Sequence, residues 1–516
     1  MCKRLVDEKP IIKHAAFHMR LHRIVFSLWI GLTMAAAVES TNVTARLVTL
    51  QGCVDMAIEH NLDVQIQRIY PEMVRYSLSA SYGAYDPTFS LSGKHSYRLL
   101  PKAGGLDHPD SSTDSFEMGF SGLLPSGLAY GLSGDLSQSY GLNTFPKLGI
   151  VDGFENSSGT ASLFFLKQPL LKNFWIDGAR KAIWANKKNL QMSELDLQSL
   201  IMSIITEVEV AYYGLILAGE NVKVQGKALE LSMKLLAENK KRVEVGAMAP
   251  LDEKDAASQV AANRANLLSE KNNLAIKQTV LKRLLKENFT DWHQIPLEPT
   301  EPLRAVPQAF SLQDSWHKGL SLRPDFQKYR LELALQDIEI RYSRNQLFPE
   351  LDLEGTYGHL GQGREYSGAW SQIRDGENPF YSFGATLRFP LSNRGARAQY
   401  KTSKAQKEQL VLRMKKAEQQ ILTSIDNAVK SAQSSYEQVD ATKQAREFAE
   451  AAMDAEQKKL ENGKSTSFIV LRLQSILTQQ RSAEIRALAN YNMALALLAA
   501  EEGYTLQRHN LQLGVK

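Results

Sequence analysis

The sequence predicts a mainly α-helical protein with a smaller set of β-strands, built as two copies of one structural unit. Three observations support this fold class. The chain resembles itself at two fixed offsets, several apolar-periodic stretches are far longer than ordinary globular helices, and shorter segments alternate strictly between apolar and polar residues. With 516 residues, 43% of them hydrophobic and 23% charged, most of the chain can fold around a core.

The charge balance and the cysteine content exclude several functional classes. The net charge is +5, and four of these charges come from the first 37 residues, so the remainder has no basic excess for nucleic acid. Cys2 and Cys53 are too few for a disulfide scaffold or a cysteine metal site. No metal-spaced histidine cluster, phosphate loop or nucleophile elbow follows the leader. The sequence therefore predicts no catalytic residue, no cofactor, no metal site and no enzyme.

The N-terminal segment has the layout of a secretory signal peptide. Basic residues precede an apolar run from Ile24 to Met34, and three alanines follow it. The run is shorter than the ~20 residues of a spanning helix, so cleavage is expected after residue 37, and no other stretch is expected to cross a bilayer as a helix. A lipoprotein-like segment ending at Cys53 offers a second interpretation, which the polar residues between it and the apolar run disfavour.

An internal duplication fixes the domain organisation. A shift of 262 residues superimposes the starts of the two units without a gap, and a shift of 217 superimposes the long helices that follow. The matched pairs include Asp63 with Asp325, Arg68 with Arg330, Pro87 with Pro349, Gly178 with Gly395 and Gly246 with Gly463. We expect a first repeat over 38–288, a Pro-rich equatorial linker over 289–310, a second repeat over 311–505 and a C-terminal tail over 506–516.

Each repeat has the same expected order of elements. Opening helices are predicted over 50–82 and 312–344, strands over 87–168 and 349–390, long helices over 178–245 and 395–462, tips at 246–252 and 463–469, and returning helices over 251–287 and 467–502. A helix of 68 residues would extend roughly 100 Å. The 4-3 spacing of Leu197, Ile201 and Ile204 predicts that the long helices coil around neighbours.

The alternating segments predict strands with one apolar and one polar face. Phe89 and Leu91 alternate with Ser90 and Ser92 in the first repeat, and the segment 381–389 alternates in the second. The first repeat contains two further alternating segments around the turn at 125–127. This extra hairpin either enlarges the barrel that such strands would form or caps that barrel outside the membrane, and the sequence leaves both possibilities open.

The strand pattern of an exported chain predicts a membrane barrel that is shared between copies. Unpaired strand edges are too costly inside a bilayer, and these strands are too few to close a barrel alone. Several chains would therefore contribute strands, with apolar faces toward lipid and polar faces toward a wet interior, and the long helices would continue the wall. The alternative is a secreted coiled-coil scaffold or adhesin, which would need a second apolar layer to cover the sheet.

The repeated motifs resemble those of the TolC family of outer-membrane efflux proteins. They are LTLQGCVDMAIEHNLDVQ and FSLQDSWHKGLSLRPDFQ at the repeat starts, QPLLKNFWIDGAR and FPLSNRGAR before the long helices, and RVEVGAMAPLD and LENGKSTSFIVLRLQ at the tips. The resemblance covers nearly all of the chain after the leader. It implies a homotrimer that forms a trimeric α/β-barrel channel-tunnel, with a shared β-barrel in the outer membrane of a Gram-negative envelope.

The resemblance also implies partners and a role without catalysis. Such a channel is a passive conduit of a tripartite efflux or type I secretion system. It docks through its helical tips onto a periplasmic adaptor (membrane fusion) protein and an inner-membrane pump of RND, ABC or MFS type. Drugs, metals and proteins are the possible cargoes, and nothing in the sequence selects among them.

The tips carry the residues to which the resemblance assigns roles. It places Asp252 and Asp255 at a tunnel constriction, although Ile469 and Arg472 stand at the matching positions of the second repeat. The alternative is that the acids only favour the positive end of the returning helix. Adaptor docking is expected at Gly246, Met248, Pro250, Gly463, Lys464 and Ser465. The two glycines also suit helix C-caps.

Overall fold

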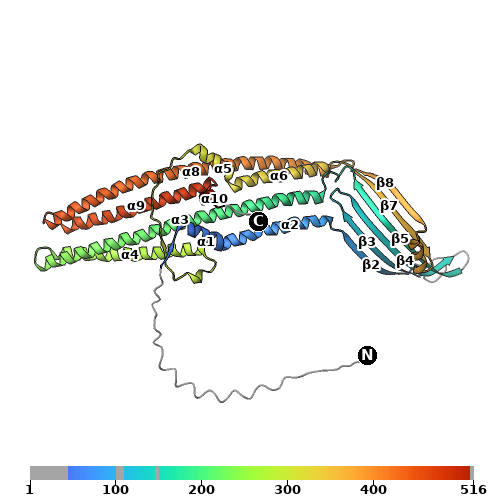
Figure 1. Ribbon diagram of the computed structural model, residues 1–516, viewed down its shortest axis with the longest axis horizontal. Helices are drawn as coiled ribbons and strands as arrows, with labels where there is room; N and C mark the ends of the chain where they lie inside the picture. The colour runs from blue at the N-terminus through green and yellow to red at the C-terminus, as the bar shows by residue number, and fades with distance from the viewer. Residues whose placement is uncertain (1–44, 100–109, 146–149, 512–516) are drawn as a thin grey trace, which may run out of the picture.

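The protein is an elongated molecule with a β-sheet at one end and long helices running away from it (Figure 1). The computed structural model describes residues 45–99, 110–145 and 150–511. The predicted signal peptide and the last five residues of the predicted tail lie outside these ranges. The described residues are mainly α-helical with one large sheet, in agreement with the fold class predicted from the sequence.

The sheet has six antiparallel strands in the order β2-β3-β4-β5-β7-β8. The first repeat supplies β2 (Thr88–Leu99), β3 (Asp110–Leu123), β4 (Ala129–Phe145) and β5 (Ile150–Pro169), and the second supplies β7 (Glu350–Gly363) and β8 (Pro379–Arg388). The predicted extra hairpin is β3–β4. Within the sheet β3 pairs with β2, and β4 pairs with β5, so the hairpin is an integral part of the sheet.

Both opening helices are broken near their middle, so the prediction of single helices over 50–82 and 312–344 was wrong. The first repeat has α1 (Leu50–His60) and α2 (Leu62–Tyr82), and the second has α5 (Leu312–Leu322) and α6 (Pro324–Asn345). Each break has an identifiable cause at equivalent positions, 61 and 323. The helical pattern continues through these positions, so periodicity alone does not mark them.

Asn61 breaks the first opening helix by capping the second half. Its backbone is extended, and its side-chain oxygen accepts hydrogen bonds from the backbone N–H groups of Asp63 and Val64. Its amide also donates to the carbonyl of Leu284 on a returning helix. In the second repeat, Arg323 is extended because it precedes Pro324, which disfavours helical geometry in the residue before it.

The long helices and their tips agree closely with the periodic pattern. The first hairpin is α3 (Gly178–Glu244) with α4 (Pro250–Leu285), and the second is α8 (Arg394–Glu461) with α9 (Ser467–Glu501). Gly246 and Gly463 have φ values of +72° and +69°, where a side chain would be strained. At both tips the N–H of the following residue bonds a carbonyl five residues back, as in a Schellman cap.

One expectation about membrane helices needs correction. Among the described residues, α3 contains a window that is long and apolar enough to cross a bilayer, whereas the sequence was expected to hold none after the leader. Most of this window is buried against the neighbouring helices. Its apolar side chains, including Ile201, Ile205 and Leu215, therefore belong to the core of the helical body.

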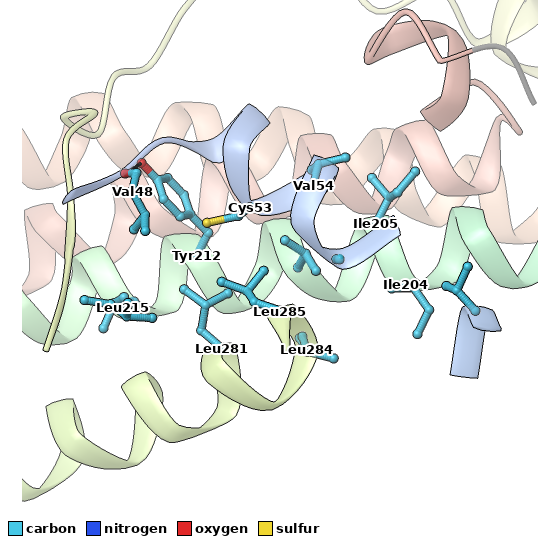
Figure 2. Packing of buried hydrophobic residues seen from close by; sticks show 14 of the residues in the cluster. Val48, Cys53, Val54, Ile204, Ile205, Tyr212, Leu215, Leu281, Leu284 and Leu285 are labelled. Atoms are coloured by element: carbon cyan, nitrogen blue, oxygen red, sulfur yellow. Dashed lines mark hydrogen bonds between the residues drawn. The ribbon is translucent and has the colours of Figure 1, made fainter. Parts of the chain in front are cut away.

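The core of the first repeat lies where α1, α3 and α4 meet at mid-height (Figure 2). Val54, Ile205 and Leu285 are fully buried there. The Tyr212 hydroxyl donates to the Val48 carbonyl of β1 (Arg46–Val48) at 3.2 Å. The equatorial linker adds a short 3₁₀ helix, η2 (Phe289–Asp291), and a strand, β6 (Leu297–Pro299), that pairs in parallel with β1. The linker is thus tied to the start of the first repeat at the equator.

The described end of the chain is anchored to the same level. Helix α10 (Thr505–Arg508) contacts α3 and α9. The carboxylate of Glu209, which is fully buried on α3, accepts from His509 at 3.2 Å and lies 3.5 Å from the Arg508 guanidinium. A buried carboxylate requires such partners, so this contact fixes the C-terminal segment against the long helix.

Candidate functional site

One face of the sheet is a continuous apolar surface. Residues directly opposite each other in a ladder lie on the same face. Rows of such opposite residues run across β2, β3 and β4, and a second set of rows runs across β5, β7 and β8. The pair of Tyr130 on β4 and Leu166 on β5 joins the two sets. Exposed members of the face are Phe89, Leu91, Phe116, Met118, Phe120, Leu132, Phe164, Leu166, Leu353, Tyr381, Phe383 and Leu387. An exposed apolar surface of this extent needs an apolar partner or lipid.

The opposite face of the sheet is dominated by hydroxyl and charged groups. Ser92 lies opposite Glu117, which lies opposite Asp135, and the next row is Lys94, Ser115 and Ser137. Hydroxyls pair along this face, for example Ser137 with Ser158 at 2.9 Å. The Lys167 ammonium lies 2.8 Å from the Asp352 carboxylate and 3.0 Å from that of Glu354. Phe165 and Leu360 are apolar exceptions. This face is suited to water.

A short helix marks the upper limit of the apolar surface. Helix α7 (Tyr366–Arg374) lies across the end of the sheet remote from the long helices and contacts β4, β5 and β7. It packs so closely on β7 that a Cβ added at Gly361 would collide with the Ala369 carbonyl, and the Tyr366 hydroxyl donates to the Asp114 carbonyl at 3.1 Å. The neighbouring rows include the hydrogen bond between the His95 ring and the Asp114 carboxylate, at 2.6 Å. The apolar rows therefore lie between this polar rim and the helical body.

The molecule has two open edges, and each runs from the sheet into the helical body. Strand β2 follows α2 after the short 3₁₀ helix η1 (Gly83–Tyr85), and β8 leads into α8 through a short loop. The helices next to the sheet lie in the order α2-α3-α6-α8, the same order as the strands they join. At one edge α2 exposes a 3-4-3 series of apolar side chains, Ile66, Ile69, Met73 and Tyr76, and at the other α8 exposes Leu412 to 66%.

These edge residues were missed by the sequence reasoning. The helices α2 and α8 bury one face within the chain and still expose large apolar groups on another. The signal that could have found them is apolar spacing on a second face of the same helix, which a single-face pattern search does not register.

The two helical tips lie side by side and are bonded to each other. The Ser467 hydroxyl, at the start of α9, donates to the Asn239 side-chain oxygen of α3 at 2.9 Å, and it lies 3.8 Å from the Met248 sulfur. Gly246, Pro250, Gly463 and Lys464 are exposed, and Met248 and Ser465 are half-buried. The residues with predicted docking roles are thus brought together at one end of the molecule, largely accessible to a partner.

The two acids with a predicted constriction role lie in the first turns of α4. Asp252 is half-buried and Asp255 is exposed. Asp252 is in the first turn, where a negative charge favours the helix N-terminus, and its carbonyl accepts from the Asn239 amide at 3.3 Å. A single chain does not test whether these carboxylates face a pore, so their role at a constriction stays a prediction.

The remaining chemistry-bearing groups point to structure. Cys53 is fully buried in α1, and burial raises the pKa of its thiol to about 12, so the thiol is inert at neutral pH. Processing ahead of Cys53 would also remove β1 and the N-cap of α1, Thr49, which argues against lipidation there. Within the described residues, no group of three or more His, Cys, Asp or Glu side chains is placed to hold a metal ion.

Comparisons with known proteins identify this architecture. The family model of outer membrane efflux proteins matches residues 138–286 and 317–503, one segment from each repeat. No curated protein sequence matches this chain.

Several solved structures have the same fold. A membrane protein from Pseudomonas aeruginosa superposes with a TM-score of 0.65 at 18% identity, covering 88% of this chain and 93% of that one. The Campylobacter jejuni CmeC outer membrane channel gives 0.64 at 16% identity with 90% of both chains covered, and Vibrio cholerae VceC gives 0.64 at 16%, covering 88% and 96%. The chain therefore belongs to the outer membrane efflux protein family, and it is an outer-membrane protein whose helices extend into the periplasm.

Proposed function

We propose that this chain forms the outer-membrane channel of a tripartite efflux or type I secretion system. Three copies form a ring, the sheets close one barrel across the outer membrane, and the helices form a tunnel through the periplasm. The channel is passive. Adaptor and pump, of RND, ABC or MFS type, supply selection and energy from the inner membrane.

The observation that carries this proposal is the pair of open edges. Within the described part of the chain, each edge combines a strand that pairs on one side only with a helix that exposes large apolar side chains. An open strand edge is untenable in lipid, and the sheet has an apolar face that requires lipid. The two edges differ from each other, so one edge of each copy must join the other edge of the next copy. Such an interface closes a ring when the rotation from one copy to the next divides a full turn into equal parts. The face rich in hydroxyl and charged groups would then line the bore.

The first experiment is planar-bilayer conductance of the purified mature chain, with the oligomeric mass determined on the same sample. Discrete conductance steps from a trimer support the channel. A trimer that inserts into the bilayer but does not conduct would indicate that the tunnel is closed at its tips until an adaptor binds. A soluble particle that never inserts would overturn the proposal and favour the secreted coiled-coil scaffold or adhesin.

A matched pair of variants tests the edges. Met73 and Met233 are both exposed methionines, but Met73 lies on the open edge helix α2 and Met233 on α3, which has neighbours on both sides. A charge at an interface core is costly. We therefore expect Met73→Glu to reduce the trimer fraction severely and Met233→Glu to leave it nearly unchanged, as measured by native mass spectrometry.

Docking at the tips has its own test. A photo-reactive amino acid in place of Lys464 should cross-link a periplasmic adaptor in intact cells, identified by mass spectrometry. The same amino acid in place of Lys187, an exposed lysine of α3 near the sheet, should not. Equal cross-linking from both positions would contradict docking through the tips.

A further inference from the structure

We infer that the hairpin β3–β4 is part of the transmembrane wall, so that three copies close a barrel of eighteen strands in which β2 of one copy pairs with β8 of the next. This inference rests on the proposed function, because it takes the ring of three copies from there. It adds the strand number, the strands at the joint and the width of the bore.

Strand directions at the two edges permit this joint. Strand β2 starts at the helical body and runs away from it, whereas β8 returns to it. Because the six strands alternate in direction, an edge-to-edge contact between β2 and the neighbour's β8 is antiparallel, like every ladder within the sheet. The two edges are similar in length, with 12 residues in β2 and 10 in β8. The apolar face also continues across the joint, with Phe89 and Leu91 on one side and Phe383 and Leu387 on the other.

The hairpin has the two faces of a wall element. On the apolar face, Phe116 and Met118 lie in the same rows as Gly93 and Leu91 of β2. On the other face, Ser115 lies between Lys94 and Ser137. A hairpin that capped the barrel outside the bilayer would have no reason to keep both faces in register with its neighbours.

The turn of the hairpin lies at the helical end of the sheet. Gly127, with φ of +85°, is held so close to the start of α3 that an added Cβ would lie 2.9 Å from the Arg180 guanidinium. The Gln168 amide, at the end of β5, donates to the Ser126 carbonyl at 3.5 Å. The hairpin therefore extends along the apolar band from its helical end, between β2 and β5.

At an ordinary strand tilt, the widths of the two layers match when the hairpin is counted. Four helices per copy lie side by side beneath the sheet, and at 8–10 Å each they span about 32–40 Å of circumference. Six strands spaced ~4.8 Å apart and tilted by ~40° span about 38 Å, whereas four strands would span about 25 Å. With the hairpin in the wall, barrel and tunnel meet at the same radius. Three copies then give a barrel about 35 Å across between opposite backbones.

Single-cysteine labelling in liposomes tests the inference. In a Cys53→Ser background, the hairpin variants are Ser137→Cys, on the polar face of β4, and Met118→Cys, on the apolar face of β3. The matched controls outside the hairpin are Thr386→Cys and Phe383→Cys, on the polar and apolar faces of β8. A charged, water-soluble methanethiosulfonate reports access to water, and quenching of an attached bimane by brominated lipid reports contact with the bilayer.

We expect the hairpin pair to behave like the β8 pair. The charged reagent should label Ser137→Cys at least tenfold faster than Met118→Cys, and brominated lipid should quench only the label at position 118. Equal labelling at 118 and 137 without quenching, while the β8 pair keeps its difference, would place the hairpin outside the wall and overturn the inference alone. Loss of the difference in the β8 pair as well would instead contradict the proposed function.

Discussion

The two repeats of this chain share their helical frame and differ in their strands. The long helices contain 67 and 68 residues, the returning helices 36 and 35, and both tips turn at a glycine with nearly the same positive φ. The strand region differs, with four strands in the first repeat against two strands and the short helix α7 in the second. In both repeats the long helix packs against the returning helix and the second half of the opening helix, so its length is constrained. A sheet, in contrast, can gain a hairpin without disturbing the strands beside it.

A second contrast lies at the breaks of the opening helices. The first repeat uses the neutral amide of Asn61, which is buried. The second uses Arg323, whose guanidinium binds the carboxylates of Asp325 and Glu501 and donates to the Glu501 carbonyl at 3.2 Å. The same bend is thus held by neutral hydrogen bonds in one repeat and by charges in the other, and variants can separate the two.

The largest effect is expected at the neutral break. Asn61→Ala removes the cap of α2 and leaves the buried carbonyl of Leu284 without its side-chain donor. The loss should be about 2–3 kcal/mol, and it should not depend on salt. The measurement is the thermal unfolding midpoint at low and high salt. A loss below ~0.5 kcal/mol would show that packing, and not the cap, holds the break.

The next largest loss of stability is expected at a contact between an opening helix and a long helix, where the two repeats place one methyl group on different helices. Gly319 of α5 contacts Ile425 of α8, and the matching positions in the first repeat hold Ala57 and Val208, so the carbon count of each pair is the same. The Cβ of Gly319→Ala would collide with the Ile425 side chain. Overpacking should exceed the gain in helix propensity and cost about 1–2 kcal/mol.

A double variant tests this exchange directly. Gly319→Ala with Ile425→Val recreates the pair of the first repeat and should recover most of the lost stability. The measurement is a double-mutant cycle, which compares the unfolding midpoints of the two single variants and the double variant. Additive losses would mean that the two positions do not compensate each other and that the match in carbon count is coincidental.

The tips should respond equally to the same change. Gly246→Ala and Gly463→Ala each force a side chain into the left-handed region, at a cost of about 1 kcal/mol, while open space surrounds both positions. The expected result is a matched small fall in the thermal midpoint. The Ser465 hydroxyl, two residues after Gly463, donates to the Glu456 carboxylate. A clearly larger loss at position 463 would indicate that this hydrogen bond constrains the second tip more strongly.

The charged break should be sensitive to acid, and the neutral one should not. Burial raises the pKa of Asp325, but the hydrogen bond and charge of Arg323 outweigh it and hold this pKa below its usual 3.8. A depressed pKa stabilises the folded state above pH ~4, and this contribution is lost as the pH falls through the folded value. Asp325 is half-exposed, so the effect should stay below ~1 kcal/mol.

Hydrogen exchange can locate this loss. Between pH 5 and 3, protection should fall at the α5–α6 break more than at the α1–α2 break, after correction for the intrinsic rate. Asp325→Asn should remove the difference. Equal losses at both breaks would show that acid acts on the whole helical body and not through the ion pairs of Arg323.

Much of this fold could be predicted because long repeats and strict alternation are strong signals. The shift of 217 residues located both tips. Thr49 and Ser311 stand just before the apolar-periodic segments, where hydroxyl residues favour N-caps, and their side chains do accept from backbone N–H groups of α1 and α5. The breaks at 61 and 323 interrupt no periodicity, and the search for periodicity therefore passed over both, although Pro324 is a local signal for the second break. The place of the extra hairpin could not be predicted, since alternation defines a strand but not its neighbours. The acids at the tip face no pore within one chain, so their role at a constriction stays a prediction.

The smallest effect on stability, and the clearest on function, is expected at the first tip. Asp252→Ala with Asp255→Ala changes only the first tip, since the second holds Ile469 and Arg472 at the matching positions. If three copies place these carboxylates at a constriction, their removal lowers cation preference or raises conductance with a nearly unchanged unfolding midpoint. Bilayer recordings with unequal salt on the two sides measure this as a shift of the reversal potential. If the acids only favour the N-terminus of α4, conductance and selectivity do not change. The thermal midpoint then falls by an amount that corresponds to about 0.5–1 kcal/mol of unfolding free energy. The two roles predict opposite pairs of readings, so one double variant decides between them.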